Sequence, residues 1–208
     1  MRYNTTGDSN SGMGAFALYT NTTGSYNTGV GYEALSGNTT GSFNTATGIV
    51  GLYSNTTGSY NTSAGYEALG SNTTGWGNTA SGNSSLVYNS TGMRNTADGT
   101  HALFSNSTGS RNIALGYEAG SNLTTGNYNI DIGNRGVAGE SATIRLGGGD
   151  HQRLCLGRLY HDAFDGCSGL RHLGRQARCS YFVTSLQAGH PRNGRRQRRD
   201  AFAASRHL

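Results

Sequence analysis

The residues best suited to acid–base chemistry are three glutamates that share one position of a repeat: Glu33, Glu67 and Glu118. Glu33 and Glu67 are two repeat units apart, which would separate their carboxyl groups by about 9.6 Å along a β-solenoid. That distance touches the range for the paired carboxylates of inverting glycosidases. Because neither a base nor a nucleophile accompanies them, we expect a solvated face. We predict that the chain is not an enzyme.

Cysteine and histidine could bind a metal ion, but their spacing argues against a site. Cys155, Cys167 and Cys179 are 12 residues apart and no Cys-x-x-Cys pair occurs, whereas structural zinc sites use such pairs. The run from Gly147 to Gly149 matches no nucleotide-binding pattern. We therefore predict no metal and no cofactor.

Arginine supplies the remaining charge chemistry. Residues 1–149 carry five Arg against seven Asp or Glu, whereas residues 150–208 carry eleven Arg against four Asp. A cluster within residues 192–199 would attract phosphate groups. Because Arg and His interrupt every short apolar run, no face is wide enough to bury, and we expect residues 150–208 to be a disordered tail. No nucleic acid partner is expected.

Aromatic residues recur at or beside the sixth position of the repeat and form a candidate binding surface: Tyr26, Phe43, Tyr60, Trp76 and Tyr128. Such a ladder could bind sugar rings or a partner protein. It could also stack ring on ring between neighbouring coils, which is the favoured interpretation. The recurring Asn-x-Thr triplets could accept glycans, but they have the period of a turn, so turn chemistry is the simpler reason for them.

A repeat of 17 residues positions all these candidates. Asn-Thr-Thr-Gly or Asn-Ser-Thr-Gly begins at Asn4 and recurs every 17 residues as far as Asn106, and an eighth copy begins at Leu123 as Leu-Thr-Thr-Gly. No insertion or deletion interrupts the eight units. A strict period requires each unit to superimpose on the next, as in a solenoid.

Three positions of the unit are identical in all eight copies. The fourth position is Gly7, Gly24, Gly41, Gly58, Gly75, Gly92, Gly109 and Gly126. The seventh position is Asn10, Asn27, Asn44, Asn61, Asn78, Asn95, Asn112 and Asn129. The eleventh position is Gly14, Gly31, Gly48, Gly65, Gly82, Gly99, Gly116 and Gly133. We expect these glycines to provide positive φ or close backbone approach, and the asparagines to cap a turn or stack on the next coil.

Between these markers the unit has two candidate strands. The first is Asn-Thr-Ala-x-Gly, as in residues 44–48, with a small ninth residue; the second is Tyr-Glu-Ala-Leu, as in residues 32–35 and 66–69, with leucine at the fifteenth position. No stretch has a helical period. The sequence therefore predicts an all-β fold, a parallel β-solenoid or β-roll of eight 17-residue coils over residues 4–149. Each coil would be strand, turn, strand, turn, and the rod about 38 Å long.

Each coil offers little apolar surface to offset the entropy of ordering its residues. One leucine, one tyrosine and two small residues fall short of what a stable isolated coil needs, and no cysteine lies in the array to staple it. We therefore expect a homotrimer in which thin coils share a core.

The Asn-Thr-Ala-x-Gly stretches and the Ala-Leu pairs, such as 34–35 and 68–69, resemble the head repeats of trimeric autotransporter adhesins and the shafts of phage tail fibres. The resemblance covers about residues 4–139. It implies a left-handed β-roll, three chains with a common interior, and a location on a cell surface or a phage virion. The unit is longer than the commonest head repeats. We expect no signal peptide and no membrane span.

That resemblance also implies a β-connector and a self-cleaving intramolecular chaperone after the array, which residues 153–208 do not resemble. We hypothesise that these residues come from a shifted reading frame. Residues 153–164 can be encoded so that reading one base later gives VFVSGVYTTTLS, a strand-turn-strand sequence. A one-base slip between Gly147 and Arg153 would explain the excess of arginine. Sequencing the gene tests this, since a frame without the alternative peptide would refute it.

The predicted function is that of a non-enzymatic fibre or adhesin module. Its repetitive outer face would bind a host surface protein, matrix or glycan weakly at each coil and strongly by avidity. The alternative is an ice-binding solenoid that uses a threonine ladder at the second position, which thermal hysteresis would reveal. That ladder is Thr5, Thr22, Thr39, Thr56 and Thr73.

Overall fold

A computed structural model describes residues 2–148, which form nine short strands and no helix. The strands are β1 (Ser11–Met13), β2 (Thr28–Val30), β3 (Thr45–Thr47), β4 (Thr62–Ala64), β5 (Thr79–Ser81), β6 (Thr96–Asp98), β7 (Ile113–Leu115), β8 (Ile130–Ile132) and β9 (Ile144–Leu146). Within residues 2–148 no helix could span a membrane. The expectations for the basic tail and its reading frame lie outside the described residues.

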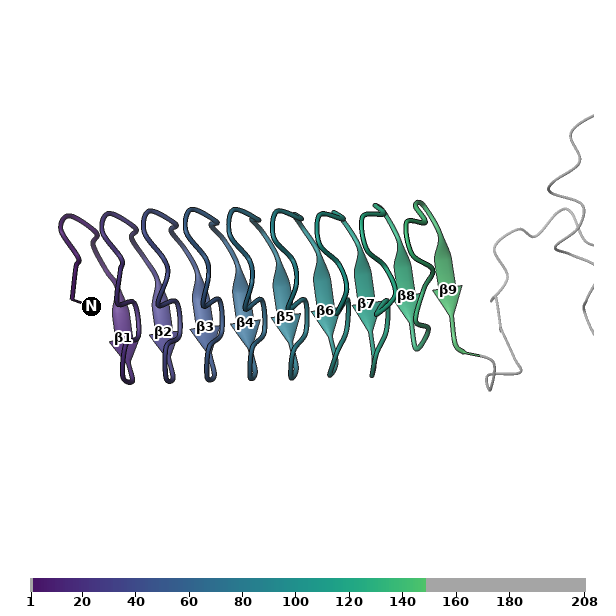
Figure 1. The fold of residues 1–208 in the computed structure, drawn as a ribbon, viewed down its shortest axis with the longest axis horizontal. Coiled ribbons are helices and arrows are strands. Elements are labelled where there is room, and N and C mark those ends of the chain that lie inside the picture. The colour runs from purple at the N-terminus through teal and green to yellow at the C-terminus, as the bar shows by residue number, and fades with distance from the viewer. Residues whose placement is uncertain (1, 149–208) are drawn as a thin grey trace, which may run out of the picture. The chain divides into compact units, whose positions relative to one another are not determined.

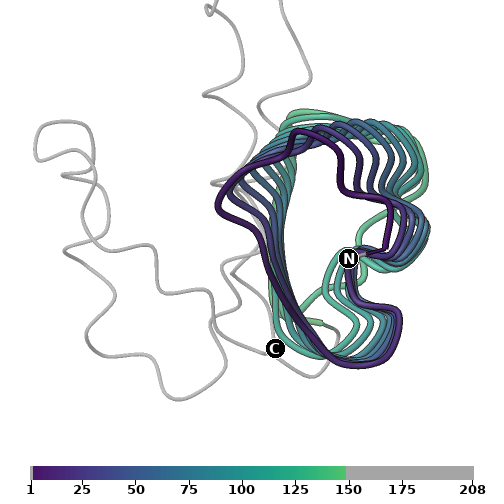
Figure 2. The ribbon, with the colours of Figure 1, turned by 90° about the vertical axis from the view of Figure 1, so that its left-hand side faces the viewer.

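All nine strands belong to one parallel sheet in chain order. Successive strands pair in register, so that Gly29 lies beside Ala46 and Ala46 beside Ser63. Figure 1 shows the strands side by side along the rod, and the end view in Figure 2 shows the coils superimposed. The predicted all-β parallel β-solenoid is confirmed.

The last coil is shorter than the others. Ile130 pairs with Ile144, 14 residues later, whereas every earlier pair is separated by 17. The carbonyl of Glu140 accepts the side-chain amide of Asn129, a bond that a fourth-position glycine carbonyl accepts in earlier coils. The three missing residues therefore come from the turns between Gly133 and Glu140.

The second predicted strand is wrong. Residues 32–35 and 66–69 form turns, and Glu33 and Leu35 have φ of 55° and 54°. Backbone in that left-handed region is not extended. The turn still bonds to the next coil, because the N–H of Leu35 donates to the carbonyl of Gly51 at 3.0 Å. Each coil is thus one strand followed by a series of turns, and the turn directs both Ala34 and Leu35 into the core.

The core lies inside each coil, between the fifteenth and ninth positions. The fully buried fifteenth-position leucines are Leu18, Leu35, Leu52, Leu69, Leu86 and Leu103. The ninth position must be small, because a Cβ built on Gly29 would lie 3.1 Å from the carbonyl oxygen of Ala34 and 3.5 Å from Cγ of Leu18. This core is closed within one chain, so a core shared between chains would have to form on an outer face.

Two buried asparagine ladders run along the rod. At the first position, Nδ2 of Asn38 donates to Oδ1 of Asn21 at 2.7 Å and to the carbonyl of Gly41 at 2.9 Å. At the seventh position, Oδ1 of Asn27 accepts the backbone N–H of Asn44 at 2.9 Å. The predicted coil-to-coil stacking of asparagine is confirmed, and it provides hydrogen-bond partners for most of these buried amides.

The fourth- and eleventh-position glycines serve the two purposes predicted for them. A Cβ on Gly41 would lie 2.2 Å from the carbonyl oxygen of Gly58, which requires close backbone approach without positive φ. Gly48 at the eleventh position has a φ of 130°, and its Cβ would lie 2.3 Å from the carbonyl oxygen of Gly65. No side chain fits at Gly41 or Gly48.

Candidate functional site

The residue at the sixth position of each coil stands at the outer tip of a turn. Tyr26, Phe43 and Tyr60 have φ between 57° and 59°, and the N–H of Phe43 donates to the carbonyl of Ser25 in the preceding coil at 3.0 Å. Identical backbone conformation in successive coils gives the side chains the same direction. We call these side chains the sixth-position column: Ser9, Tyr26, Phe43, Tyr60, Gly77, Arg94, Arg111 and Tyr128.

Three consecutive rings of this column form a stack. The ring centroids of Tyr26 and Phe43 are 4.9 Å apart and those of Phe43 and Tyr60 are also 4.9 Å apart, with interplanar angles of 6° and 5°. The predicted ring-on-ring stacking is confirmed for these three residues. Because each inner ring face is covered by a neighbour, the stack presents ring edges along its length and open faces only at its ends.

Trp76 and Tyr128 do not join the stack. Trp76 occupies the fifth position, and the guanidinium of Arg94 lies over its ring at 4.4 Å from the centroid. Arg111 lies over the ring of Tyr128 at 5.0 Å and donates a hydrogen bond to the Tyr128 hydroxyl. The outer face from Trp76 to Tyr128 therefore carries two arginine–aromatic pairs.

Arg94 and Arg111 differ from the arginines near the C-terminal end of the described chain. Arg135 and Arg145 pair with Glu118 and Glu140, whereas within residues 2–148 no ion pair involves Arg94 or Arg111. An exposed guanidinium held only on an aromatic ring keeps most of its donors free. These two arginines, one coil apart, can therefore bind an external anion.

The outer face of the sheet changes character along the rod. Its eighth position holds threonine on five neighbouring strands and then isoleucine on the last three. The threonines are Thr28, Thr45, Thr62, Thr79 and Thr96. On β7, β8 and β9 both outward positions are aliphatic, and they align in register as two rows. We call these six residues the aliphatic patch: Ile113, Ile130, Ile144, Leu115, Ile132 and Leu146.

Five of the six patch side chains are exposed, and Ile144 is 67% exposed. Contiguous exposed aliphatic surface of this kind marks interaction sites. The patch was not predicted, although the sequence indicates it, because isoleucine replaces threonine at the eighth position.

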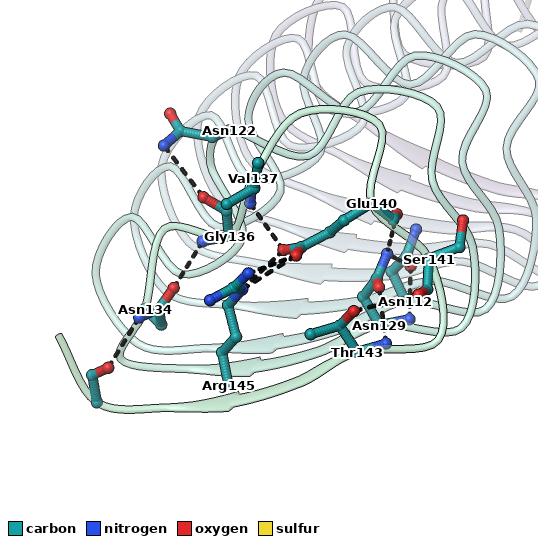
Figure 3. Close-up of polar contacts among 11 residues, drawn as sticks. Asn112, Asn122, Asn129, Asn134, Gly136, Val137, Glu140, Ser141, Thr143 and Arg145 are labelled. Atoms are coloured by element: carbon teal, nitrogen blue, oxygen red, sulfur yellow. Dashed lines mark hydrogen bonds and ion pairs between the residues drawn. The ribbon is translucent and has the colours of Figure 1, made fainter. Parts of the chain in front are cut away.

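A second unpredicted feature is a charged interior at the C-terminal coil. Asp131 stands at the ninth position, where other coils have glycine, alanine or serine, and its carboxyl group is buried without a hydrogen-bond partner in the described chain. Figure 3 shows Arg145 directed into the coil toward Glu140, which it binds with three hydrogen bonds of 2.7 to 3.1 Å. Carboxylate at a position reserved for small residues is the signal that sequence reasoning overlooked.

Burial raises the pKa of Asp131 to about 6, the Glu140 carboxylate adds to the increase and Arg145 opposes it. The bond from Arg145 lowers the pKa of Glu140 below its usual range. Gly136 leaves room for the buried carboxyl, because a Cβ there would lie 2.8 Å from Oδ2 of Asp131. Charged side chains therefore fill the interior of the last coil, beyond the last of the fifteenth-position leucines, Leu103.

The glutamates of the thirteenth position do not form a paired site in the described chain. Glu118 binds Arg135, and Glu33 interacts with the hydroxyl of Tyr32, whose pKa it raises. Among residues 2–148 no group of three His, Cys, Asp or Glu side chains could hold a metal ion.

The threonine ladder of the second position is engaged within the fold. The hydroxyl of Thr22 donates to the carbonyl of Thr39 at 3.0 Å, and that of Thr39 to the carbonyl of Thr56 at 2.9 Å. These side chains bind one coil to the next and offer few free hydroxyl donors.

The chain as a whole matches no protein-family model, no curated protein and no solved structure.

Proposed function

We propose that the chain is a non-enzymatic module of a surface or tail fibre, which binds a host surface protein, matrix or glycan through its repetitive outer face. The observation that carries this proposal is the column of side chains at the turn tips, repeated at one-coil intervals, with stacked aromatic rings and with arginines that have no acidic partner among residues 2–148. A rigid rod with a repeated surface is suited to multivalent contact, since each weak contact raises the effective concentration of the next.

We also propose that the module is a homotrimer assembled through the aliphatic patch. The leucine core is closed within each chain, so assembly must use an outer face. Six aliphatic side chains on three neighbouring strands, five of them exposed, supply a surface whose burial would stabilise the assembled rod.

The test uses the full chain on immobilised matrix proteins and polysaccharides at several surface densities. We expect slow dissociation at high density and fast dissociation at low density, and sedimentation as a trimer. A folded monomer that binds no surface at any density would refute the proposal.

Ice binding remains the second candidate, moved to a different face. The second-position threonines are engaged in coil-to-coil hydrogen bonds, but the eighth-position threonines from Thr28 to Thr96 point outward from a flat sheet in register. A regular row of hydroxyl and methyl groups is what an ordered water lattice would contact. Thermal hysteresis in a solution of the full chain, lost in Thr62→Lys, would favour this function over adhesion.

A further inference from the structure

We propose that the gap at Gly77 in the sixth-position column is a binding site for an acidic polysaccharide, whose sugar ring lies on Tyr60 and whose anionic groups bind Arg94 and Arg111. This inference rests on the proposed function, because it names the ligand class of the same outer face. Four residues carry it: Tyr60, Trp76, Arg94 and Arg111.

The gap follows from the regular spacing of the column. Rings stack at 4.9 Å from Tyr26 to Tyr60, and the next coil has Gly77 where the next ring would stand. Gly77 has the same positive φ as its neighbours, 66° against 59° for Tyr60. The column is therefore interrupted by a missing side chain and not by a change of backbone, which leaves one face of the Tyr60 ring without a stacked ring.

Two other residues border the gap. Trp76 stands next to Gly77 in the same coil and is 38% exposed. The guanidinium of Arg94 lies over the indole at 4.4 Å, and Cγ of Arg94 lies 3.6 Å from the Cβ that Gly77 lacks. A ring entering the gap would meet an aromatic face, an indole and a guanidinium together. Sugar rings bind aromatic faces through their apolar C–H groups, and carboxylates or sulfates bind guanidinium groups.

The cations extend along the rod in the direction a linear chain would take. Arg94 and Arg111 are successive members of the column, one coil or about 4.8 Å apart, and neither has an acidic partner in the described chain. A polymer with an anionic group on each of several units could reach both. A single acidic monosaccharide could reach only one.

A single-stranded nucleic acid is the rival ligand, because aromatic and arginine side chains bind it as well. Two observations favour the saccharide. Residues 1–149 have more acidic than basic residues, seven against five, whereas nucleic acid grooves are strongly basic. In addition, the stacked rings cover one another's inner faces, so only one ring face is open beside Gly77. Successive bases of a nucleic acid would need several open ring faces in a row.

Trp76 makes the test direct, because it is the only tryptophan of the chain and lies in the site. We would titrate the full chain with tetragalacturonate and follow the tryptophan fluorescence, with neutral maltotetraose and an oligothymidylate of equal charge as comparison ligands. We expect a saturable change with tetragalacturonate that weakens as salt is raised, and none with the other two. The arginines of residues 150–208 could also bind a polyanion, so only binding that Arg94→Gln weakens is assigned to the gap.

Two variants probe the parts of the site separately. Gly77→Tyr would complete the stack, since tyrosine already adopts this backbone conformation at Tyr26, Tyr60 and Tyr128, and we expect affinity to fall at least about tenfold as the open face is covered. Arg94→Gln should also weaken binding about tenfold, the typical value of a charge-assisted hydrogen bond. Arg135→Gln removes an equal charge that is paired with Glu118 and should leave affinity unchanged.

An unchanged affinity in both Gly77→Tyr and Arg94→Gln would overturn the site, as would the absence of any fluorescence change with tetragalacturonate. A stronger response to oligothymidylate would overturn the saccharide assignment. If the chain bound matrix surfaces by avidity while all these titrations were flat, this inference would fail and the proposed function would stand.

Discussion

Val50 has a φ of 51° at the thirteenth position of its coil. A β-branched residue in the left-handed region is strained by about 1–2 kcal/mol. Asparagine tolerates this conformation far better, so we expect Val50→Asn to raise the free energy of unfolding by about 1 kcal/mol. Thermal unfolding followed by circular dichroism would measure the gain.

Val30→Asn is the matched control, because Val30 lies in β2 with extended backbone. It should be neutral or destabilising. An equal gain in both variants would show that removal of exposed apolar surface, and not relief of strain, is responsible.

Asp131 predicts an unusual dependence of stability on pH. Its pKa is raised in the folded chain to about 6 from an ordinary value of 3.8, so its contribution to stability is fully present below pH 4 and is lost as pH rises through 6. We expect Asp131→Asn to raise the melting temperature at pH 8 and to change it little at pH 4.

Glu140 has the opposite sign, because its pKa is lowered in the folded chain. Its contribution is present above its ordinary value of 4.5 and is lost as pH falls below it. Glu140→Gln should therefore destabilise at pH 8 and have little effect at low pH. If both variants behaved alike across this range, the charged interior would not control the C-terminal coil.

At the scale of the element, close approach of coils matters more than backbone conformation. Gly65 and Gly77 both have positive φ, 140° and 66°. A Cβ on Gly65 would lie 2.5 Å from the carbonyl oxygen of Gly82, whereas a Cβ on Gly77 would lie 3.6 Å from its nearest contact. We expect Gly65→Val to lower the free energy of unfolding by roughly 3 kcal/mol or more, measured by chemical denaturation.

Gly77→Val separates the two causes, because it keeps the unfavourable φ for valine but has room for the side chain. A loss of about 1–2 kcal/mol is expected there. Equal losses in the two variants would mean that φ alone sets the requirement for glycine at Gly65.

The first strand of each coil could be predicted from the sequence and the second could not, for a physical reason. Residues 44–48 combine outward β-formers with a small inward residue, as a strand against a tight core requires. Residues 32–35 also resemble a strand, but Ala34 and Leu35 are both buried, and Glu33 and Leu35 have positive φ, which no propensity of those residues would suggest. The pairing of Arg94 with Trp76 depends on side-chain rotamers and is likewise invisible in residue types.

For the whole molecule, the aliphatic patch predicts where chains associate. Leu115→Lys places a charge within the patch, on β7, while Thr62→Lys places it on the threonine part of the same sheet face. We expect sedimentation to show loss of the trimer with the first variant and a trimer with the second, since burying an unpaired charge is costly. Dissociation by both, or by neither, would place the contact elsewhere.

The unbroken 17-residue register from β1 to β8 fixes distances along the rod in whole numbers of coils. Any two groups in one column are separated by a whole number of coils, about 4.8 Å each, so the distance from the Gly77 gap to the aliphatic patch is set by counting units. Deleting one complete unit would shorten that distance by one coil and would keep the repeated asparagines and glycines in register with those of the next coil. Deleting a single residue would put all later asparagines and glycines out of step. The length of such a molecule can change only by whole coils. The affinity of a ligand that spans two sites along the rod would therefore depend on the number of repeats between them.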